Sequence, residues 1–107
     1  MQKQVINPRR LRQVPEQFSW VDQRLVRHDY IRHCNCHGLA LYLFLITVSD
    51  HQGLSYYSDA KVATLLSLSE TELVCGRMQL LKADLIAYEA PIYQVLNLPS
   101  QPMGGRP

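Results

Sequence analysis

Polar side chains gather on one side of a helix that the sequence predicts over residues 69–83. Glutamine can form paired hydrogen bonds with adenine, and glutamate can accept one from cytosine N4. Lysine can neutralise a phosphate. These abilities suit the base edges and the backbone of a nucleic acid duplex, and they require no covalent chemistry. Helical spacing places on this arc Thr71, Glu72, Cys75, Met78, Gln79 and Lys82.

Two serines mark helix starts on either side of a short turn. Ser69 and Glu72 are three residues apart, which is the spacing of a capping box and opens the second helix. Ser58 can cap an earlier helix, which an apolar face at helical spacing supports. Because a helix N-terminus favours anions, we expect Ser58 and Lys61 to contact phosphates, with Ser69 in the same surface.

The opposite arc of the second helix predicts how it packs and where it ends. Gly76 lies there among leucines, and a helical glycine costs about 1 kcal/mol relative to alanine. Its presence therefore indicates close approach by another helix. Asp84 follows the helix, and we expect it to end the helix as a left-handed or turn residue, which aspartate tolerates better than most residues.

A β-hairpin is predicted after the second helix. Residues 85–88 and 93–98 are rich in apolar and β-forming side chains, and residues 89–92 form a short turn that contains a proline. Residues 54–57 can add a third strand. Two helices followed by a hairpin are a helix-turn-helix with a wing.

The residues before this motif predict supporting elements. Residues 38–48 are nearly all apolar, but eleven residues are too few to span a bilayer, which takes about 20. They are expected to form a buried core helix. Residues 22–34 predict an amphipathic helix, or a turn and a helix, and residues 18–21 a short edge strand. The fold class is therefore mainly α with a small β-sheet (α+β), a winged helix-turn-helix in the order α-α-β-α-α-β-β.

Four segments of the chain carry a resemblance to a known family. They are residues 20–22 (WVD), 40–45 (ALYLFL), 53–58 (GLSYYS) and 80–86 (LLKADLI). Together they resemble the winged helix of bacterial and plasmid replication initiators and of helix-turn-helix proteins from mobile elements. The resemblance covers about residues 18–99 and implies DNA binding. The chain departs from the family pattern at Asp84, where a glycine is usual.

Charge is distributed unevenly along the 107 residues. Residues 1–32 hold seven basic and three acidic residues, and residues 33–107 hold four and six, so the formal net charges of +4 and −2 give +2 overall. The candidate DNA-reading helix therefore lies in the acidic part. An N-terminal arm, residues 1–17, could supply phosphate contacts through Arg9, Arg10 and Arg12, or could be only a flexible, solubilising tail. We expect residues 18–99 to form the domain and residues 100–107 to form a disordered tail.

The cluster His33-Cys34-Asn35-Cys36-His37 holds side chains that bind zinc elsewhere, but its spacing fits no zinc finger or ribbon. We therefore expect no metal and no cofactor. No phosphate loop, zinc-protease or serine-hydrolase motif occurs, so an enzyme is not expected. An odd number of cysteines and the absence of a secretory signal favour the cytoplasm, and the nucleoid if the chain binds DNA.

The sequence thus predicts non-catalytic binding of double-stranded DNA, in transcription regulation, replication or mobile-element biology. The alternative is a protein-interaction module on the same scaffold, with a separate protein or a second copy as partner and no role for a membrane. Cys75 and Met78 on the outer arc, and the acidic start of the helix at Glu70 and Glu72, favour that alternative.

Overall fold

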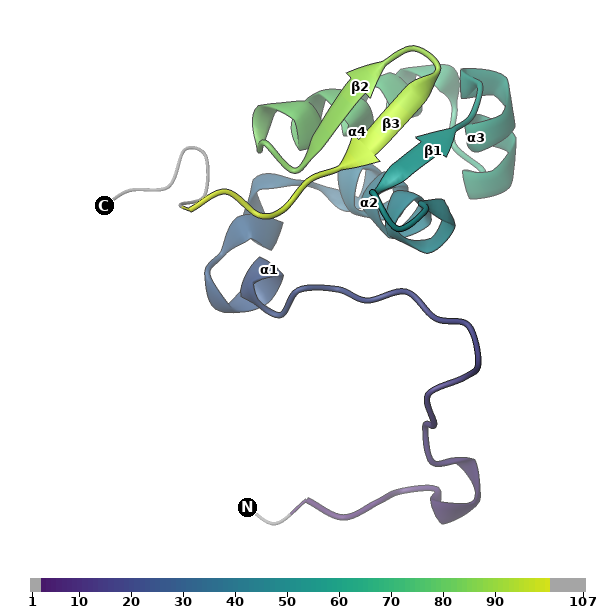
Figure 1. Cartoon of the computed structure of the whole chain (residues 1–107), viewed down its shortest axis with the longest axis vertical. Coiled ribbons are helices and arrows are strands. Elements are labelled where there is room, and N and C mark those ends of the chain that lie inside the picture. The colour runs from purple at the N-terminus through teal and green to yellow at the C-terminus, as the bar shows by residue number, and fades with distance from the viewer. Residues whose placement is uncertain (1–2, 101–107) are drawn as a thin grey trace.

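The computed structural model describes residues 3–100, which form a helical body covered on one side by a small sheet (Figure 1). The mainly α fold with a small antiparallel sheet, in a winged-helix-like layout, is confirmed. The elements are η1 (Pro8–Arg10), α1 (Arg24–Arg27), η2 (Tyr30–His33), α2 (Cys36–Val48), β1 (Leu54–Tyr56), α3 (Asp59–Leu66), α4 (Glu70–Lys82), β2 (Ile86–Glu89) and β3 (Ile92–Val95).

The core forms where α2 packs against α4. Leu41 and Leu45 of α2 and Leu73 and Leu80 of α4 are fully buried. A Cβ atom at Gly76 would lie 2.8 Å from the His37 carbonyl oxygen, closer than real Cβ contacts. The prediction of close helix approach at Gly76 is therefore confirmed, and the partner is the first turn of α2.

The predicted helix caps are present. The Ser58 hydroxyl accepts a hydrogen bond from the Lys61 amide (3.2 Å) at the start of α3. At the start of α4, Ser69 Oγ accepts from the Glu72 amide (3.1 Å), and Glu72 Oε1 accepts from the Ser69 amide (2.8 Å). Asp84 has φ of 62°, which is the left-handed conformation, one of the two expected of it. Local sequence signals therefore set the start of both helices and the end of α4.

The three strands form one antiparallel sheet in the order β1-β3-β2, with Ala90 and Pro91 linking the hairpin. Ile92 lies opposite Tyr56 on one side and Glu89 on the other. Buried side chains from the hairpin, such as Ile86 and Tyr93, join the helical core. The sheet thus closes the core over α2 and α4, as the β2 and β3 arrows in front of α4 show (Figure 1).

Arg77 of α4 connects three other elements. Its Nη1 donates to Asp59 Oδ1 of α3 (2.8 Å) and to the Tyr93 hydroxyl of β3 (3.0 Å). Its guanidinium carbon lies 4.3 Å from the centroid of the Tyr88 ring of β2. Burial opposes the charge on Arg77, but the bonds to Asp59 and Tyr93 outweigh it and raise the pKa above its ordinary value. Arg77 therefore stays charged and holds α3, α4 and the hairpin together.

The structure corrects the N-terminal part of the prediction. The expected edge strand at residues 18–21 is wrong, because this segment lies along the C-terminal half of α2, where Ser19 Oγ donates to the Thr47 carbonyl (3.4 Å). The expected helix over residues 22–34 is divided into α1 and η2 by Asp29, whose φ of 66° cannot continue a helix. The last strand ends at Val95, three residues earlier than expected.

The two ends of the chain differ from the compact core. Residues 3–17 are exposed throughout and lead away from the helices (Figure 1). The core extends from Leu25 to Leu98, within the predicted domain. Most of the expected disordered tail, residues 101–107, lies outside the described residues.

No helix within residues 3–100 combines the length and the apolar character needed to cross a membrane.

Replacing Arg77 with methionine is expected to lower the free energy of unfolding by about 3 kcal/mol, since Asp59 loses its partner and the Tyr93 hydroxyl its donor. Chemical denaturation of the purified chain measures this loss. Arg24→Met is the control, because the Arg24–Asp22 pair is exposed and should change stability much less. Equal effects of the two substitutions would contradict the central role of Arg77.

Candidate nucleic-acid interface

The predicted outer arc of α4 is divided between two environments. Its members on the side of α2 contact the first turn of that helix, whereas the others face solvent. The solvent-facing strip, called the outer strip below, keeps Thr71, Cys75, Met78 and Lys82 of the predicted arc and also includes Val74 and Leu81, which the prediction had not placed there. All six are exposed.

Gln79 and Glu72 belong to the side that faces α2. Gln79 Oε1 accepts a hydrogen bond from the Asn35 amide (2.8 Å), next to the start of α2, and its Nε2 lies 3.6 Å from Cys75 Sγ. Glu72 Oε2 lies 3.4 Å from His37 Nε2, while its other oxygen completes the capping box. Both side chains, predicted to read bases, therefore have partners within the domain.

This arrangement changes what the two residues can offer to a ligand. A paired contact with adenine needs both ends of a glutamine amide, but the oxygen of Gln79 is already occupied. The sequence placed Gln79 on the outer arc correctly by angle. It gave no sign that the first turn of α2 would lie against that part of the arc.

The outer strip is mainly apolar. Val74, Met78 and Leu81 expose 41%, 61% and 36% of their surface, and Lys82 is the one basic residue on the strip. Apolar side chains can contact the methyl group of thymine, and threonine can also hydrogen-bond a base edge. The strip can therefore make contacts within a major groove, although few of them would be hydrogen bonds.

The N-terminus of α3 lies beside the middle of α4, because Asp59 in its first turn bonds Arg77. Lys61 and Ser58 are exposed there. The Ser58 hydroxyl uses an oxygen lone pair in the helix cap, so its proton remains available to a phosphate. Ser69, with the same kind of cap, is also exposed at the start of α4. Ser58 and Lys61 thus lie at the end of α3 that contacts α4 through Asp59 and Arg77, and Ser69 lies at the N-terminal end of α4.

The predicted cations of the N-terminal arm are placed elsewhere. Arg9, Arg10 and Arg12 are exposed on the N-terminal segment, which leaves the body beyond residues 18–21, beside the C-terminal half of α2 (Figure 1). The structure does not bring them beside α4. They can reach a phosphate only where the DNA extends past the domain or where the arm changes its path.

Two residues that the sequence analysis did not assign to DNA binding, Arg32 and His33, lie on the α2 side of α4. Arg32 and His33 of η2 line a hollow of about 640 Å³ together with Lys82 of α4. The sequence shows only that Arg32 and His33 precede α2. The packing of α2 on α4 is what brings them to Lys82, fifty residues later in the case of Arg32.

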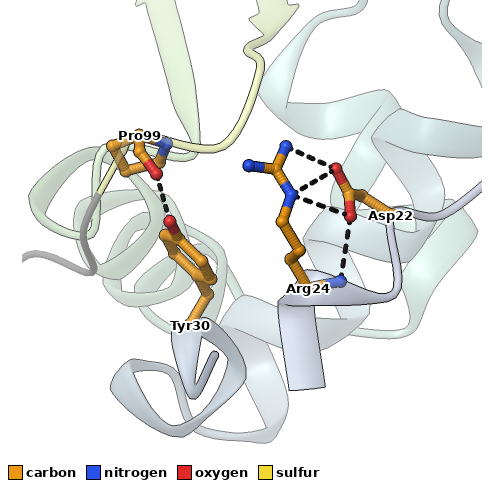
Figure 2. A network of polar contacts seen from close by, with 4 residues as sticks. All are labelled: Asp22, Arg24, Tyr30 and Pro99. Carbon is orange, nitrogen blue, oxygen red and sulfur yellow. Dashed lines mark hydrogen bonds and ion pairs between the residues drawn. The ribbon is translucent and has the colours of Figure 1, made fainter. Parts of the chain in front are cut away.

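A polar network fixes the position of η2 (Figure 2). Tyr30, almost fully buried, donates its hydroxyl proton to the Pro99 carbonyl, which joins η2 to the segment after β3. Nearby, Arg24 bonds the Asp22 carboxylate through two nitrogens and thereby holds the pKa of that carboxyl below its ordinary value. The backbone of η2, which contains Arg32, is therefore held in position by these hydrogen bonds.

The cysteines are spread over the same region. Cys34 is half-buried, which raises the pKa of its thiol, whereas Cys36 and Cys75 are exposed. Within residues 3–100, no three His, Cys, Asp or Glu side chains are grouped so that they could hold a metal ion.

No family model, no curated protein and no solved structure matches this chain. A function for it therefore has to be argued from its own residues and their geometry.

The capping box predicts a pH dependence of stability. The hydrogen bond from the Ser69 amide lowers the pKa of Glu72 from its ordinary value of 4.5. A lowered folded-state pKa stabilises the protein above the ordinary value, and this contribution is lost as the pH falls through the folded-state pKa. The difference in unfolding free energy between the native chain and Glu72→Ala should therefore be full at pH 7 and shrink below pH 4.5.

Urea denaturation at several pH values measures this difference. Glu70→Ala is the matched control, since Glu70 stands in the same helical turn and forms no ion pair or hydrogen bond in the described part of the chain. A difference for Glu72→Ala that stays constant from pH 7 to pH 3 would show that the carboxylate does not act as a cap.

Proposed function

We propose that this chain is a non-catalytic protein that binds duplex DNA, with α4 in the major groove. The observation that carries the proposal is the uncovered outer strip of α4 with basic groups on the neighbouring α3 and on the α2 side. Ser58 and Lys61 lie at the start of α3, which contacts α4 through Asp59 and Arg77. Arg32 and His33 lie on the α2 side, in the hollow that they line together with Lys82 of the strip. A major groove likewise has a row of phosphates on each side.

The dimensions of α4 suit this placement. Its 13 residues extend about 20 Å at a rise of 1.5 Å per residue. The major groove is about 12 Å wide and admits an α-helix. In this placement Val74 and Met78 meet thymine methyl groups, and Thr71 offers a hydroxyl to a base edge. We therefore propose a preference for sites that contain thymine at the centre of the contact.

The biological setting follows from the resemblance of the sequence to replication initiators and to mobile-element proteins. A role in replication, transcription regulation or mobile-element biology is accordingly part of the proposal, as is a cytoplasmic location at the nucleoid. Binding of DNA by this domain requires no metal or cofactor.

A second candidate function is a protein-interaction module, and the spacing of the outer strip favours it. Thr71, Val74, Met78 and Leu81 follow one another at intervals of three, four and three residues. That is the pattern by which one helix packs on another in a coiled coil. Under this alternative the strip binds a helix of a partner or of a second copy, and DNA is not bound.

Two opposite substitutions at Met78 distinguish these functions. If α4 lies in the major groove, Met78→Lys should raise the affinity for duplex DNA and Met78→Glu should lower it, each by several-fold. The physical reason is the sign of the added charge beside phosphates. If the strip binds an apolar helix, both substitutions weaken that association and neither gives DNA binding.

Fluorescence anisotropy with a labelled random-sequence duplex at low salt measures the affinity, and sedimentation velocity measures self-association. Leu43→Lys and Leu43→Glu are the matched controls, because Leu43 of α2 is 63% exposed but lies outside the outer strip. If the full chain binds no duplex at low salt, the DNA proposal is wrong.

Deleting residues 1–12 tests the contribution of the arm. We expect weaker DNA binding and a less steep dependence of log K on log salt, by about 0.9 for each phosphate that the arm neutralises in the native chain. Arg9, Arg10 and Arg12 act through phosphates in this proposal, so the ratio of affinities for two duplex sequences should not change. An unchanged salt dependence would show that the arm does not bind DNA.

A further inference from the structure

The hollow between η2 and the C-terminal end of α4 has the composition of an anion site. Its basic residues are Arg32, His33 and Lys82, and its remaining walls are Cys34, Asn35, Gln79 and Ala83. No acidic side chain is among these described residues. At about 640 Å³ the hollow is large enough to admit a phosphate group.

Contacts at its base fix the two walls relative to each other. The bond from the Asn35 amide to Gln79 Oε1 (2.8 Å) joins the start of α2 directly to α4. Gly76, about two turns before Lys82 and Ala83, lets the two helices approach closely. Tyr30 anchors η2 through its bond to the Pro99 carbonyl. The backbone that carries Arg32 is therefore set at a defined position beside Lys82.

The cations of the hollow are available to a ligand. Arg32 lies 3.8 Å from Asp29, but both side chains are about 70% exposed, and an exposed pair of this kind contributes little and exchanges readily. Lys82 forms no ion pair among residues 3–100. By contrast, Arg77 and Arg24 are committed to close carboxylate partners.

We infer that this hollow binds a backbone phosphate of the DNA strand on the α2 side of the major groove, through Arg32 and Lys82. The inference rests on the proposed function. Arginine suits this position because its planar guanidinium can donate two parallel hydrogen bonds to phosphate oxygens, while lysine adds a point charge. The phosphates of the opposite strand then lie beside Ser58 and Lys61 at the start of α3.

The first experiment measures binding of a random-sequence duplex across a range of salt concentrations. Arg32→Gln and Lys82→Gln remove charge but retain much of the side-chain length. Each should reduce the slope of log K against log salt by about 0.9, which makes the decrease in affinity between 50 and 200 mM salt about 3.5-fold smaller. Arg27→Gln is the matched control, since Arg27 is exposed on the neighbouring α1 but does not line the hollow.

The second experiment locates the contact on the DNA. Single phosphates of the duplex are replaced one at a time by neutral methylphosphonates. One replacement should weaken binding by the native chain yet have no further effect on the Arg32→Gln, Lys82→Gln double variant. Thermal unfolding checks that the variants remain folded, as expected for exposed positions.

The outcomes distinguish a failure of the phosphate site from a failure of the proposed DNA binding. If the native chain binds the duplex but both glutamine variants keep its affinity and salt slope, the hollow is not a phosphate site and the proposed function stands. If the native chain binds no duplex at low salt, both are wrong. The site is supported if the salt slope is reduced for both glutamine variants but not for Arg27→Gln, and if one phosphate replacement that weakens binding by the native chain has no effect on binding by the double variant.

Discussion

Helix α4 can lie against the first turn of α2 only because residue 76 has no side chain. Any Cβ there would press on the His37 carbonyl. This close approach places the Asn35 amide within reach of Gln79 and His37 within reach of Glu72. It also brings η2, which precedes α2 directly, to the end of α4. The shape of the outer strip and of the hollow beside it both follow from this one contact.

The internal ion pairs change the meaning of the charge count. A net charge of +2 suggests weak attraction to DNA. Arg77 and Arg24, however, are paired with Asp59 and Asp22, so these pairs add neither net positive nor net negative charge to the surface. What remains is an arrangement in which exposed cations border one helix and an exposed arm carries several more. Local placement, rather than the total, decides whether a phosphate finds a partner.

Features that depend on neighbours in sequence could be predicted. The caps at Ser58 and Ser69 and the left-handed Asp84 are set by a few adjacent residues, and the structure has all of them. Gly76 was predictable as a contact because a glycine inside a helix has few other uses. For residues 22–34 the sequence predicted one helix or a turn and a helix, but it did not place the break at Asp29.

Features that depend on a distant segment could not be predicted in this way. The angular position of Gln79 on α4 was right, but its partner Asn35 lies 44 residues earlier. Arg32 meets Lys82 for the same reason, through the packing of α2. Periodicity identifies which side of a helix is polar. It does not show which part of that side another element covers, and here that difference decides which residues remain for a ligand.

The hairpin has a consequence for how much sequence such a domain could recognise. Its strands are joined by Ala90 and Pro91 alone, and neither strand carries a lysine or arginine. A wing this short and without basic residues has little to insert into an adjacent minor groove, so recognition would be confined to what α4 touches, about six base pairs at 3.4 Å each. A site of about six base pairs recurs by chance about once in four thousand positions, whereas a genome offers about 10⁶ or more competing sites. Selecting a single locus would therefore take two copies on neighbouring sites, or delivery by another DNA-bound protein.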